Sequence, residues 1–331
     1  MPFITTSSGK RFAANDGEVL LDAALRNGVS LEYSCRTGRC SSCKSRVRSG
    51  SSIALHEELG LSQGERNEGW VLSCVRAATS DMLLDVTDLG GVKLFPARTV
   101  PCRIQSLHQL SPDVMKVELR LQPASDLAYH AGQYVEVIGH GGLRRSYSIA
   151  NAPRSGKQIE LHVRQVPGGE MSEYWFGQAK PDDLLRLKGP LGTFFLRETS
   201  GNDLVFLATG TGIAPVKAML EALPGMAHEE QPRSVAVYWG GRTLADVYWK
   251  PSMSDMVHSF VPVLSRADAD WGGARGYVQQ AFLSDMSTLD HTVIYACGSE
   301  AMIHSARRLL VALGLPERRF RSDAFVCSAA V

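Results

Sequence analysis

The sequence predicts a multidomain protein of the α+β and α/β classes, with a small α+β unit, an antiparallel β-barrel and a doubly wound parallel sheet. Three observations predict this. Four cysteines cluster in the first hundred residues, short alternating segments separated by Gly and Pro follow, and apolar runs alternate with helical segments in the last third. The length of 331 residues suits two or three domains. We expect domains at residues 1–92, 98–198 and 200–331.

The first unit has the pattern of a small α+β domain. Phe3–Thr6 and Lys10–Ala14 flank a Ser-Ser-Gly turn and are expected to form a hairpin. Val19–Arg26 has its leucines and Ala24 on one face, and Asn27-Gly28 ends this predicted helix. Met82–Val86 is expected to be a strand. A linker follows, from Gly90 to Pro96.

Four cysteines of this unit have an informative spacing. Cys35, Cys40 and Cys43 stand at C-x4-C-x2-C spacing, and Cys74 follows after a gap of 30 residues. This is the plant-type [2Fe–2S] pattern. Gly38 permits the tight turns that let backbone N–H groups surround the sulfurs. We predict that these thiolates bind a [2Fe–2S] cluster, which carries one electron at a time.

Zinc and structural thiols remain as alternative uses of these cysteines. A zinc site commonly pairs two short C-x2-C units, whereas the first gap here is four residues and Cys74 has no close partner in sequence. A disulfide framework suits a short secreted chain, whereas this chain is long and has seven cysteines, an odd number.

The middle segment predicts a small barrel with a nucleotide-like ligand. Its alternating strands are expected at Val114–Leu121, Gly132–Val137 and Gln158–Val163. Gly168-Gly169-Glu170-Met171-Ser172 precedes a predicted helix at 173–178, and a helix start offers free N–H groups to a diphosphate. The loop is therefore expected to bind a ligand that carries a diphosphate.

The last segment predicts a nucleotide-binding parallel sheet. Its apolar runs are expected to form buried strands, and its helical stretches to lie between or after them. The strands are expected at Leu204–Ala208, Val235–Trp239, Phe260–Leu264 and Val293–Ala296, and the helices at Pro215–Leu223 and Ala301–Leu313. Between the first strand and the first helix lies Thr209-Gly210-Thr211-Gly212, a glycine loop in the setting that a nucleotide phosphate requires.

Several motifs resemble the ferredoxin–NADP reductase superfamily. Arg145-Ser146-Tyr147-Ser148 is similar to its R-x-Y-S flavin signature, 189–194 to a second flavin turn, and 209–215 to its G-T-G-I-A-P nucleotide loop. The whole chain resembles reductases with an N-terminal [2Fe–2S] unit followed by FAD and NAD units. The stretches 145–153 and 168–176 look closest to the reductases that serve CDP-6-deoxyhexulose dehydrases in sugar deoxygenation.

The resemblance implies the fold and the role of each unit. The first unit would be a β-grasp plant-type ferredoxin, the barrel would bind FAD, and the parallel sheet would bind NADH or NADPH. Arg145 would pair with a flavin phosphate, Tyr147 would stack on the flavin, and Ser148 would approach its N5. The loop from Tyr238 would contact the ribose, and the loop from Tyr295 would flank the nicotinamide.

The complete prediction names four metal ligands and a set of cofactor-binding residues, with no catalytic acid, base or nucleophile, because the cofactors carry the chemistry. The cofactor-binding residues are Arg145, Tyr147, Ser148, Gly168, Gly169, Met171, Ser172, Thr209, Gly210, Thr211, Gly212, Gly240, Arg242, Cys297, Gly298 and Phe325. Phe325 is a candidate to cover the flavin face, and a packed core aromatic is the alternative. NADH is preferred from the resemblance, although Ser265-Arg266 offers a site for the extra phosphate of NADPH.

The predicted activity is electron transfer from NAD(P)H through FAD and the cluster to a partner protein. The resemblance implies a CDP-4-keto-6-deoxyhexose 3-dehydrase as the acceptor. The alternative is a reductase component of a ring-hydroxylating dioxygenase or multicomponent monooxygenase. Two further alternatives are a stand-alone flavin reductase with a structural ferredoxin unit, and a redox sensor.

Charge and composition narrow the partners. A net charge of +1 gives no global signal for nucleic acid, and no run of about 18 apolar residues predicts a membrane span. The reduced thiolates and the absence of a signal-peptide pattern predict a cytoplasmic protein. Five basic residues and no acidic ones lie between Arg36 and Arg48. We expect them to form a docking rim for an acidic partner, and the alternative is that they offset the anionic cluster or lie solvated.

Overall fold

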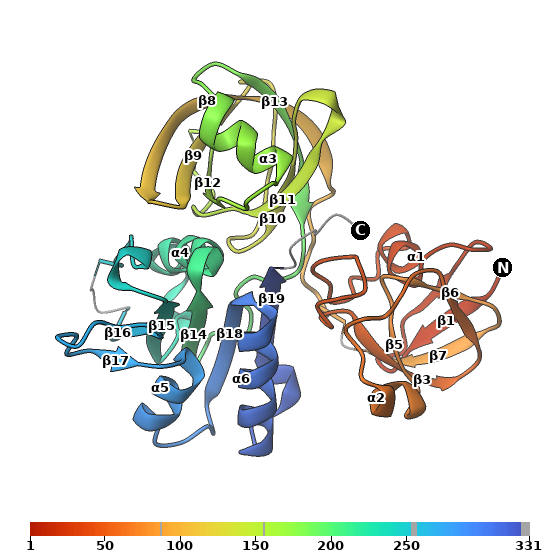
Figure 1. The fold of residues 1–331 in the computed structure, drawn as a ribbon. Coiled ribbons are helices and arrows are strands. Elements are labelled where there is room, and N and C mark those ends of the chain that lie inside the picture. The colour runs from red at the N-terminus through yellow and green to blue at the C-terminus, as the bar shows by residue number, and fades with distance from the viewer. Residues whose placement is uncertain (87, 155, 253–256, 326–331) are drawn as a thin grey trace. The chain divides into compact units, whose positions relative to one another are not determined.

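The chain forms two compact units in the computed structural model (Figure 1), which describes residues 1–86, 88–154, 156–252 and 257–325. One unit comprises residues 1–94 with the C-terminal residues from Asp323, and the other comprises residues 95–322. In the part of the chain that is described, no helix is long and apolar enough to cross a membrane.

The first unit is the expected β-grasp fold. Its sheet has the order β2-β1-β7-β3-β5, with β1 and β7 parallel and the other pairs antiparallel. Helix α1 (Leu20–Arg26) packs its buried leucines into the core with Ile4 and Leu84, so the predicted hairpin and helix are confirmed. The strands are β1 (Phe3–Thr6), β2 (Arg11–Ala13), β3 (Lys44–Ser49), β5 (Trp70–Leu72) and β7 (Met82–Asp85), with β4 (Ser52–Ala54), β6 (Arg76–Ala78) and helix α2 (Gln63–Asn67) beside them.

The second unit begins with the predicted antiparallel barrel. Its strand order is β11-β10-β13-β8-β9-β12, and a bridge between Ile149 and Leu161 joins the two edge strands. Inward aliphatic side chains such as Val135, Leu161 and Leu187 fill the interior. The strands are β8 (Arg98–Ser111), β9 (Val114–Leu121), β10 (Tyr134–Ile138), β11 (Arg144–Ser148), β12 (Gln158–Arg164) and β13 (Leu184–Leu191).

The barrel differs from the sequence prediction in the bounds of one helix and in strands β8, β11 and β13, which were not among the expected strands. The predicted helix at 173–178 begins earlier, as α3 (Glu170–Glu173), and continues as a π-helix over Tyr174–Gln178. Strand β8 has no clean alternation in sequence, because its pairing with β9 shifts register twice. Such bulges break the period of two on which strand prediction depends.

The same unit contains the predicted parallel sheet, in the order β17-β16-β15-β14-β18-β19. The chain runs from β14 outward to β15 and β16 on one side, and β18 lies on the other side of β14. The switch point therefore lies between β14 and β18, where ligands bind in open α/β sheets. The elements are β14 (Asp203–Thr209), α4 (Ile213–Ala222), β15 (Ser234–Gly241), β16 (Ser259–Leu264), β17 (Ala274–Arg275), α5 (Val278–Asp285), β18 (Thr292–Ser299), α6 (Glu300–Ala312) and β19 (Phe320–Phe325).

Candidate cofactor sites

The four predicted cluster ligands lie together in the first unit as two pairs of thiols. The Cys35 thiol is hydrogen-bonded with Cys40, and the Cys43 thiol with Cys74. Cys40, Cys43 and Cys74 are buried, and Cys35 is half-buried. Among the described residues, no three Cys, His, Asp or Glu side chains are placed to hold a single metal ion. Two pairs of thiols suit a two-iron cluster, in which four cysteines are shared between two irons.

Backbone amides around these sulfurs favour thiolates. The N–H of Thr37 donates to Cys35 Sγ at 3.4 Å, and the N–H of Cys35 donates to Cys40 Sγ at 3.4 Å. The Cys40 thiol, with the amides of Thr37 and Arg39, lowers the pKa of Cys35 to about 5 although burial opposes this. Gly38, with φ of +74°, is confined, because a Cβ there would meet the carbonyl of Glu57. The loop therefore has the chemistry of a [2Fe–2S] site.

The predicted flavin residues lie along the β10–β11 pair. Arg145 lies opposite Val137, and Tyr147 opposite Val135, so both side chains share one face of β11. The indole N–H of Trp175 donates to Tyr147 Oη at 3.1 Å, and burial raises the pKa of Tyr147 to about 12. Arg145 is half-buried, and its Nη1 donates to the carbonyl of Arg144 at 2.7 Å; among the described residues, no carboxylate forms an ion pair with its guanidinium.

Ser148 lies on the other face of β11, next to the second flavin turn. It pairs with Tyr134, which pairs with Leu191 on its other side. A Cβ at Gly192, where φ is +83°, would lie 2.8 Å from the Tyr134 ring. The structure thus brings Ser148 and the turn at 189–194 to one end of β10.

The predicted diphosphate loop lies toward the other end of β10. Met171 is buried, and its methyl group would contact a Cβ at Gly139, just beyond β10. The hydroxyl of Ser172 accepts from the N–H of Val166 at 2.9 Å, which folds the loop back on itself. Gly168 has φ of +71° and open space around it, and Gly169 precedes the first turn of α3. Met171 therefore acts as a core residue, and Ser172 holds the loop.

The glycine loop after β14 lies at the switch point of the parallel sheet. The indole N–H of Trp239 donates to the carbonyl of Gly210 at 2.9 Å. Thr209 Oγ1 accepts from the N–H of Ser299 at 3.0 Å. A Cβ at Gly212 would lie 2.9 Å from the Cα of Gly298. Three strand ends therefore meet here, and the predicted nicotinamide residues Thr209–Gly212, Cys297 and Gly298 gather at one place.

Cys297 lies deeper in this site than the loop from Tyr238, which was predicted to contact the ribose. Cys297 is fully buried, with its backbone against Gly212. A Cβ at Gly240 would lie 3.2 Å from Thr209 Cγ2, so the β15 loop also approaches the glycine loop. Arg242 is exposed, and its guanidinium lies 3.4 Å from an oxygen of Asp113 in the barrel.

Arg164 lies at the glycine loop, although the sequence patterns did not single it out. It ends β12 of the barrel, and its Nη1 would lie 2.9 Å from a Cβ at Gly210. Its Nε and Nη2 donate to Asp113 Oδ2 at 2.9 and 2.7 Å, which orients the guanidinium. A fixed guanidinium at a glycine loop suits a dinucleotide diphosphate.

Phe325 stays a prediction. It ends β19 and is half-buried. It belongs to the first compact unit, whereas the predicted flavin residues belong to the second.

Comparison with known domain families gives three matches in the order of the three predicted segments. Residues 4–79 match the 2Fe-2S iron-sulfur cluster binding domain. Residues 101–196 match the oxidoreductase FAD-binding domain, and residues 206–308 match the oxidoreductase NAD-binding domain.

Full-length relatives share all three segments. The CDP-6-deoxy-L-threo-D-glycero-4-hexulose-3-dehydrase reductase of Yersinia pestis is 42% identical over 325 residues, 97% of each chain. Reductase component 2 of terephthalate 1,2-dioxygenase from Comamonas is 31% identical, over 95% of this chain and 94% of that one. Among solved structures, the Amycolatopsis cytochrome P450 reductase GcoB is 32% identical, with a TM-score of 0.76 over 99% of this chain and 100% of that one.

Proposed function

The chain belongs to the family of NAD(P)H-dependent reductases with [2Fe–2S], FAD-binding and NAD-binding domains, and from this we propose that it supplies electrons to a CDP-4-keto-6-deoxyhexose 3-dehydrase. As a member it is an iron–sulfur flavoprotein oxidoreductase that carries electrons from NAD(P)H to a partner protein. Hydride transfer to FAD and one-electron transfer through the cluster are the redox chemistry that the bound cofactors supply.

In this proposal the residues of the chain bind and orient the cofactors. The thiol pairs of Cys35 with Cys40 and Cys43 with Cys74 hold the cluster. The β10–β11 pair, with the loop at 168–172, holds FAD, and the switch point around Gly210 holds the nicotinamide nucleotide. Arg164 contributes a cation to the nucleotide diphosphate from the barrel side.

The observation that favours a dehydrase partner is the difference in sequence identity between this chain and two of its relatives. Identity to the Yersinia dehydrase reductase is 42% over nearly the full length, against 31% for the terephthalate dioxygenase reductase. Both relatives cover the same domains, so this difference is not caused by a missing domain. A ring-hydroxylating oxygenase component as the acceptor is the second candidate, since its reductases are also full-length relatives.

Reconstitution tests the partner. Purified holoprotein, NADH and a CDP-4-keto-6-deoxyhexose 3-dehydrase with its sugar-nucleotide substrate should give deoxygenated sugar in proportion to the NADH consumed. The terephthalate oxygenase component, supplied in its place, should give NADH oxidation without hydroxylated product. Hydroxylated product with the oxygenase and none with the dehydrase would contradict the proposal.

We also propose that this partner docks at the basic rim, defined as Arg36, Arg39, Lys44, Arg46 and Arg48. Three of these side chains have carboxylate partners in the structure: Arg36 pairs with Asp22, Lys44 with Glu65 and Arg48 with Asp85. Neighbouring carboxylates offset much of the local positive charge. The basic rim should therefore attract an acidic partner more weakly than five unpaired cations would.

Charge reversal at Arg46 tests the rim, because its Nε donates to the backbone carbonyl of Glu68 at 3.0 Å and not to a carboxylate. Arg46→Glu should slow electron transfer to the dehydrase about threefold at low salt, and the difference should vanish at high salt. Arg103→Glu, on an exposed strand of the second unit, is the matched control. Equal rates for Arg46→Glu and the native chain at low salt would exclude docking at the rim.

Three further parts of the proposal concern donor, location and domains. We propose NADH as the donor, although Ser265 and Arg266 lie exposed beside Gly241 and Arg242, where a phosphate could reach them. Comparing kcat/KM for NADH and NADPH tests this.

We propose a cytoplasmic location because the cluster ligands must remain reduced thiolates. We also propose domain boundaries at 1–92, 98–198 and 200–331, with the last two packed in one compact unit.

A further inference from the structure

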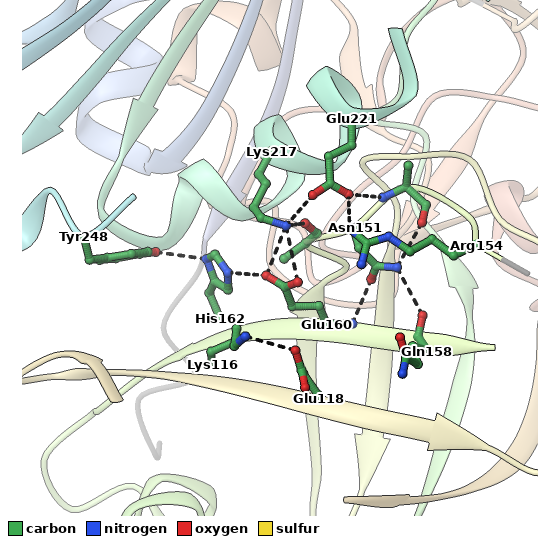
Figure 2. Close-up of polar contacts among 12 residues, drawn as sticks. Lys116, Glu118, Asn151, Arg154, Gln158, Glu160, His162, Lys217, Glu221 and Tyr248 are labelled. Atoms are coloured by element: carbon green, nitrogen blue, oxygen red, sulfur yellow. Dashed lines mark hydrogen bonds and ion pairs between the residues drawn. The ribbon is translucent and has the colours of Figure 1, made fainter. Parts of the chain in front are cut away.

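The outer face of strand β12 carries buried polar side chains. Ile159, Leu161 and Val163 point into the barrel core, so alternation turns Glu160 and His162 to the outside. Outward residues of a barrel strand usually meet water. Here Glu160 is 9% exposed and His162 is 6% exposed. Helix α4 and the segment around Tyr248, both from the parallel-sheet part of the same unit, cover them (Figure 2).

Lys217 on α4 provides the buried cation that this face requires. Its Nζ lies 3.2 and 3.3 Å from the two carboxylate oxygens of Glu160. It also donates to the carbonyl of Ala150 at 3.0 Å and to Glu221 Oε1 at 2.6 Å. An ammonium has three donors, and here it has three acceptor groups, so the lysine is fully satisfied although it is 8% exposed (Figure 2).

Neighbouring contacts fix these acceptors. His162 Nε2 lies 2.9 Å from Glu160 Oε1, and His162 Nδ1 lies 3.2 Å from the Tyr248 hydroxyl. The second oxygen of Glu221 accepts from the N–H of Ala152 at 3.1 Å and from Arg154 Nη2 at 2.7 Å. Each carboxylate therefore has partners on the barrel and on α4. Such a network has few alternative arrangements, because moving either side would leave a buried charge uncompensated.

The network joins the two predicted cofactor motifs at short range. Ala150 follows the last residue of the flavin motif, Ser148, by two positions. Helix α4 begins at Ile213, directly after the nicotinamide loop that ends at Gly212. Lys217 lies one turn into this helix. Its bond to the Ala150 carbonyl therefore connects the end of the flavin strand to the helix that carries the nicotinamide loop.

We propose that Lys217 is a positioning residue for hydride transfer. It lies outside both predicted cofactor sites and determines how closely the nicotinamide approaches the flavin. It touches neither predicted cofactor motif with its side chain. Hydride transfer moves one proton with two electrons from the nicotinamide to the flavin, and requires the reacting atoms about 3 to 3.5 Å apart. A misplacement of about 1 Å can cost about 100-fold in rate. The inference rests on the proposed placement of FAD and nicotinamide, and is independent of the electron acceptor.

The test uses the holoprotein with FAD and cluster loaded, and Lys217→Met as the main variant. Anaerobic stopped-flow absorbance gives the limiting rate of flavin reduction and the apparent Kd for NADH. Mixing NAD⁺ with the reduced protein gives the long-wavelength charge-transfer band, which reports stacking of the two rings without turnover. Flavin content is measured separately, so failure of the FAD proposal would be seen as lost flavin and not as a slow hydride step.

We expect Lys217→Met to retain FAD, to lower the limiting rate about 10- to 100-fold, to change the apparent Kd less than about threefold, and to weaken the charge-transfer band. Lys217→Arg should recover part of both signals. Arg233→Met is the matched control, since it removes an ion pair with Asp203 at the opposite end of the parallel sheet. It should leave the rate and the band unchanged.

A native limiting rate and a native band in flavin-loaded Lys217→Met would overturn the proposal, and so would a rate that falls only in proportion to lost FAD. If Lys217→Met does not fold, Glu221→Gln decides, because the amide can still accept from Ala152 while the charge facing Lys217 is gone. A limiting rate about threefold lower with a weaker band would support the proposal. A native rate and band in Glu221→Gln would contradict it.

Discussion

At the scale of single residues, the predicted cofactor sites contain a few side chains that the fold holds in place. Tyr147 is one of them, because its hydroxyl accepts from the indole of the fully buried Trp175. This hydrogen bond fixes the orientation of the Tyr147 ring. This arrangement separates the role of the ring from the role of the hydroxyl.

We predict that Tyr147→Phe retains FAD binding, whereas Tyr147→Ala weakens it about tenfold or more, since aromatic stacking is lost. Tyr147→Phe should still lower stability by about 1 to 3 kcal/mol, because the Trp175 N–H is left without an acceptor. Fluorescence quenching of FAD and thermal melting measure the two effects. Equal FAD affinity in Tyr147→Ala and the native chain would show that this ring is not in the flavin site.

Gly298 is a second such residue. Its φ is +129°, and a Cβ there would lie 2.7 Å from the backbone oxygen of Thr209. Gly298→Ala should therefore push the β18 loop away from the glycine loop and weaken NAD⁺ binding at least about tenfold. Isothermal titration of the FAD-loaded protein measures this. Gly272→Ala, where nothing lies within 4 Å, is the control and should bind normally. Native affinity in Gly298→Ala would argue against a nucleotide at this switch point.

The sequence identified these residues because their signals are local. A glycine loop between an apolar run and a helix, or an R-x-Y-S stretch, can be recognised within a few positions. Arg164 could not be found in this way, because a single arginine at the end of an alternating strand has many possible roles. Only the packing of the barrel against the parallel sheet brings it to Gly210.

At the scale of elements, β12 and α4 show what a periodic pattern leaves undetermined. Alternation in Gln158–Val163 correctly predicted a barrel strand, and alternation normally implies one face in water. Both faces of β12 are buried, and the outward one carries Glu160 and His162. Lys217 lies within the predicted helix at 215–223, but its partner is 57 positions away in the chain. Sequence periodicity contains no information on such pairing.

The ionisation of Glu160 predicts how this contact responds to pH. Burial alone would raise its pKa, but His162 and Lys217 outweigh this effect and hold the pKa at about 2, below the ordinary 4.5. Glu118 also faces it. A lowered carboxyl pKa gives stability that is present above pH 4.5 and is lost as the pH falls toward 2. The loss should be on the order of 2 kcal/mol, after discounting for partial exposure of the carboxylate.

Comparing Glu160→Gln with the native chain isolates this contribution. The native melting temperature should exceed that of Glu160→Gln above pH 5. The gap should close as the pH falls from 4.5 toward 2, because the unfolded chain takes up the proton first and the folded Glu160 takes it up only near pH 2. Glu229→Gln, at an exposed position, is the control. A gap that is constant or widens on acidification would contradict the assignment.

At the scale of the whole molecule, the predicted sites are distributed over the two compact units. The cysteine pairs lie in the first unit, and the predicted flavin and nicotinamide residues, apart from Phe325, lie in the second. The order of motifs in the sequence already predicted three segments. It did not predict that the barrel and the parallel sheet form one unit, since that depends on buried polar contacts such as Glu160 with Lys217.

This division makes the central claim testable by one substitution. The claim is that electrons enter as a hydride in the second unit and leave singly through the cluster. Cys74→Ser removes a cluster ligand and leaves the flavin and nicotinamide residues intact. Cys102→Ser is the matched control, because Cys102 is a buried cysteine of the barrel, and burial raises its pKa to about 12.

The measurement is NADH-dependent reduction of ferricyanide and of cytochrome c by the same preparation of Cys74→Ser. We predict that ferricyanide reduction, which the flavin alone supports, stays within about twofold of the native rate, while cytochrome c reduction falls at least about tenfold. Cys102→Ser should keep both activities. Cytochrome c reduction at the native rate in Cys74→Ser would contradict the account, because the ferredoxin unit would then be an appendage and not the exit of the electron path.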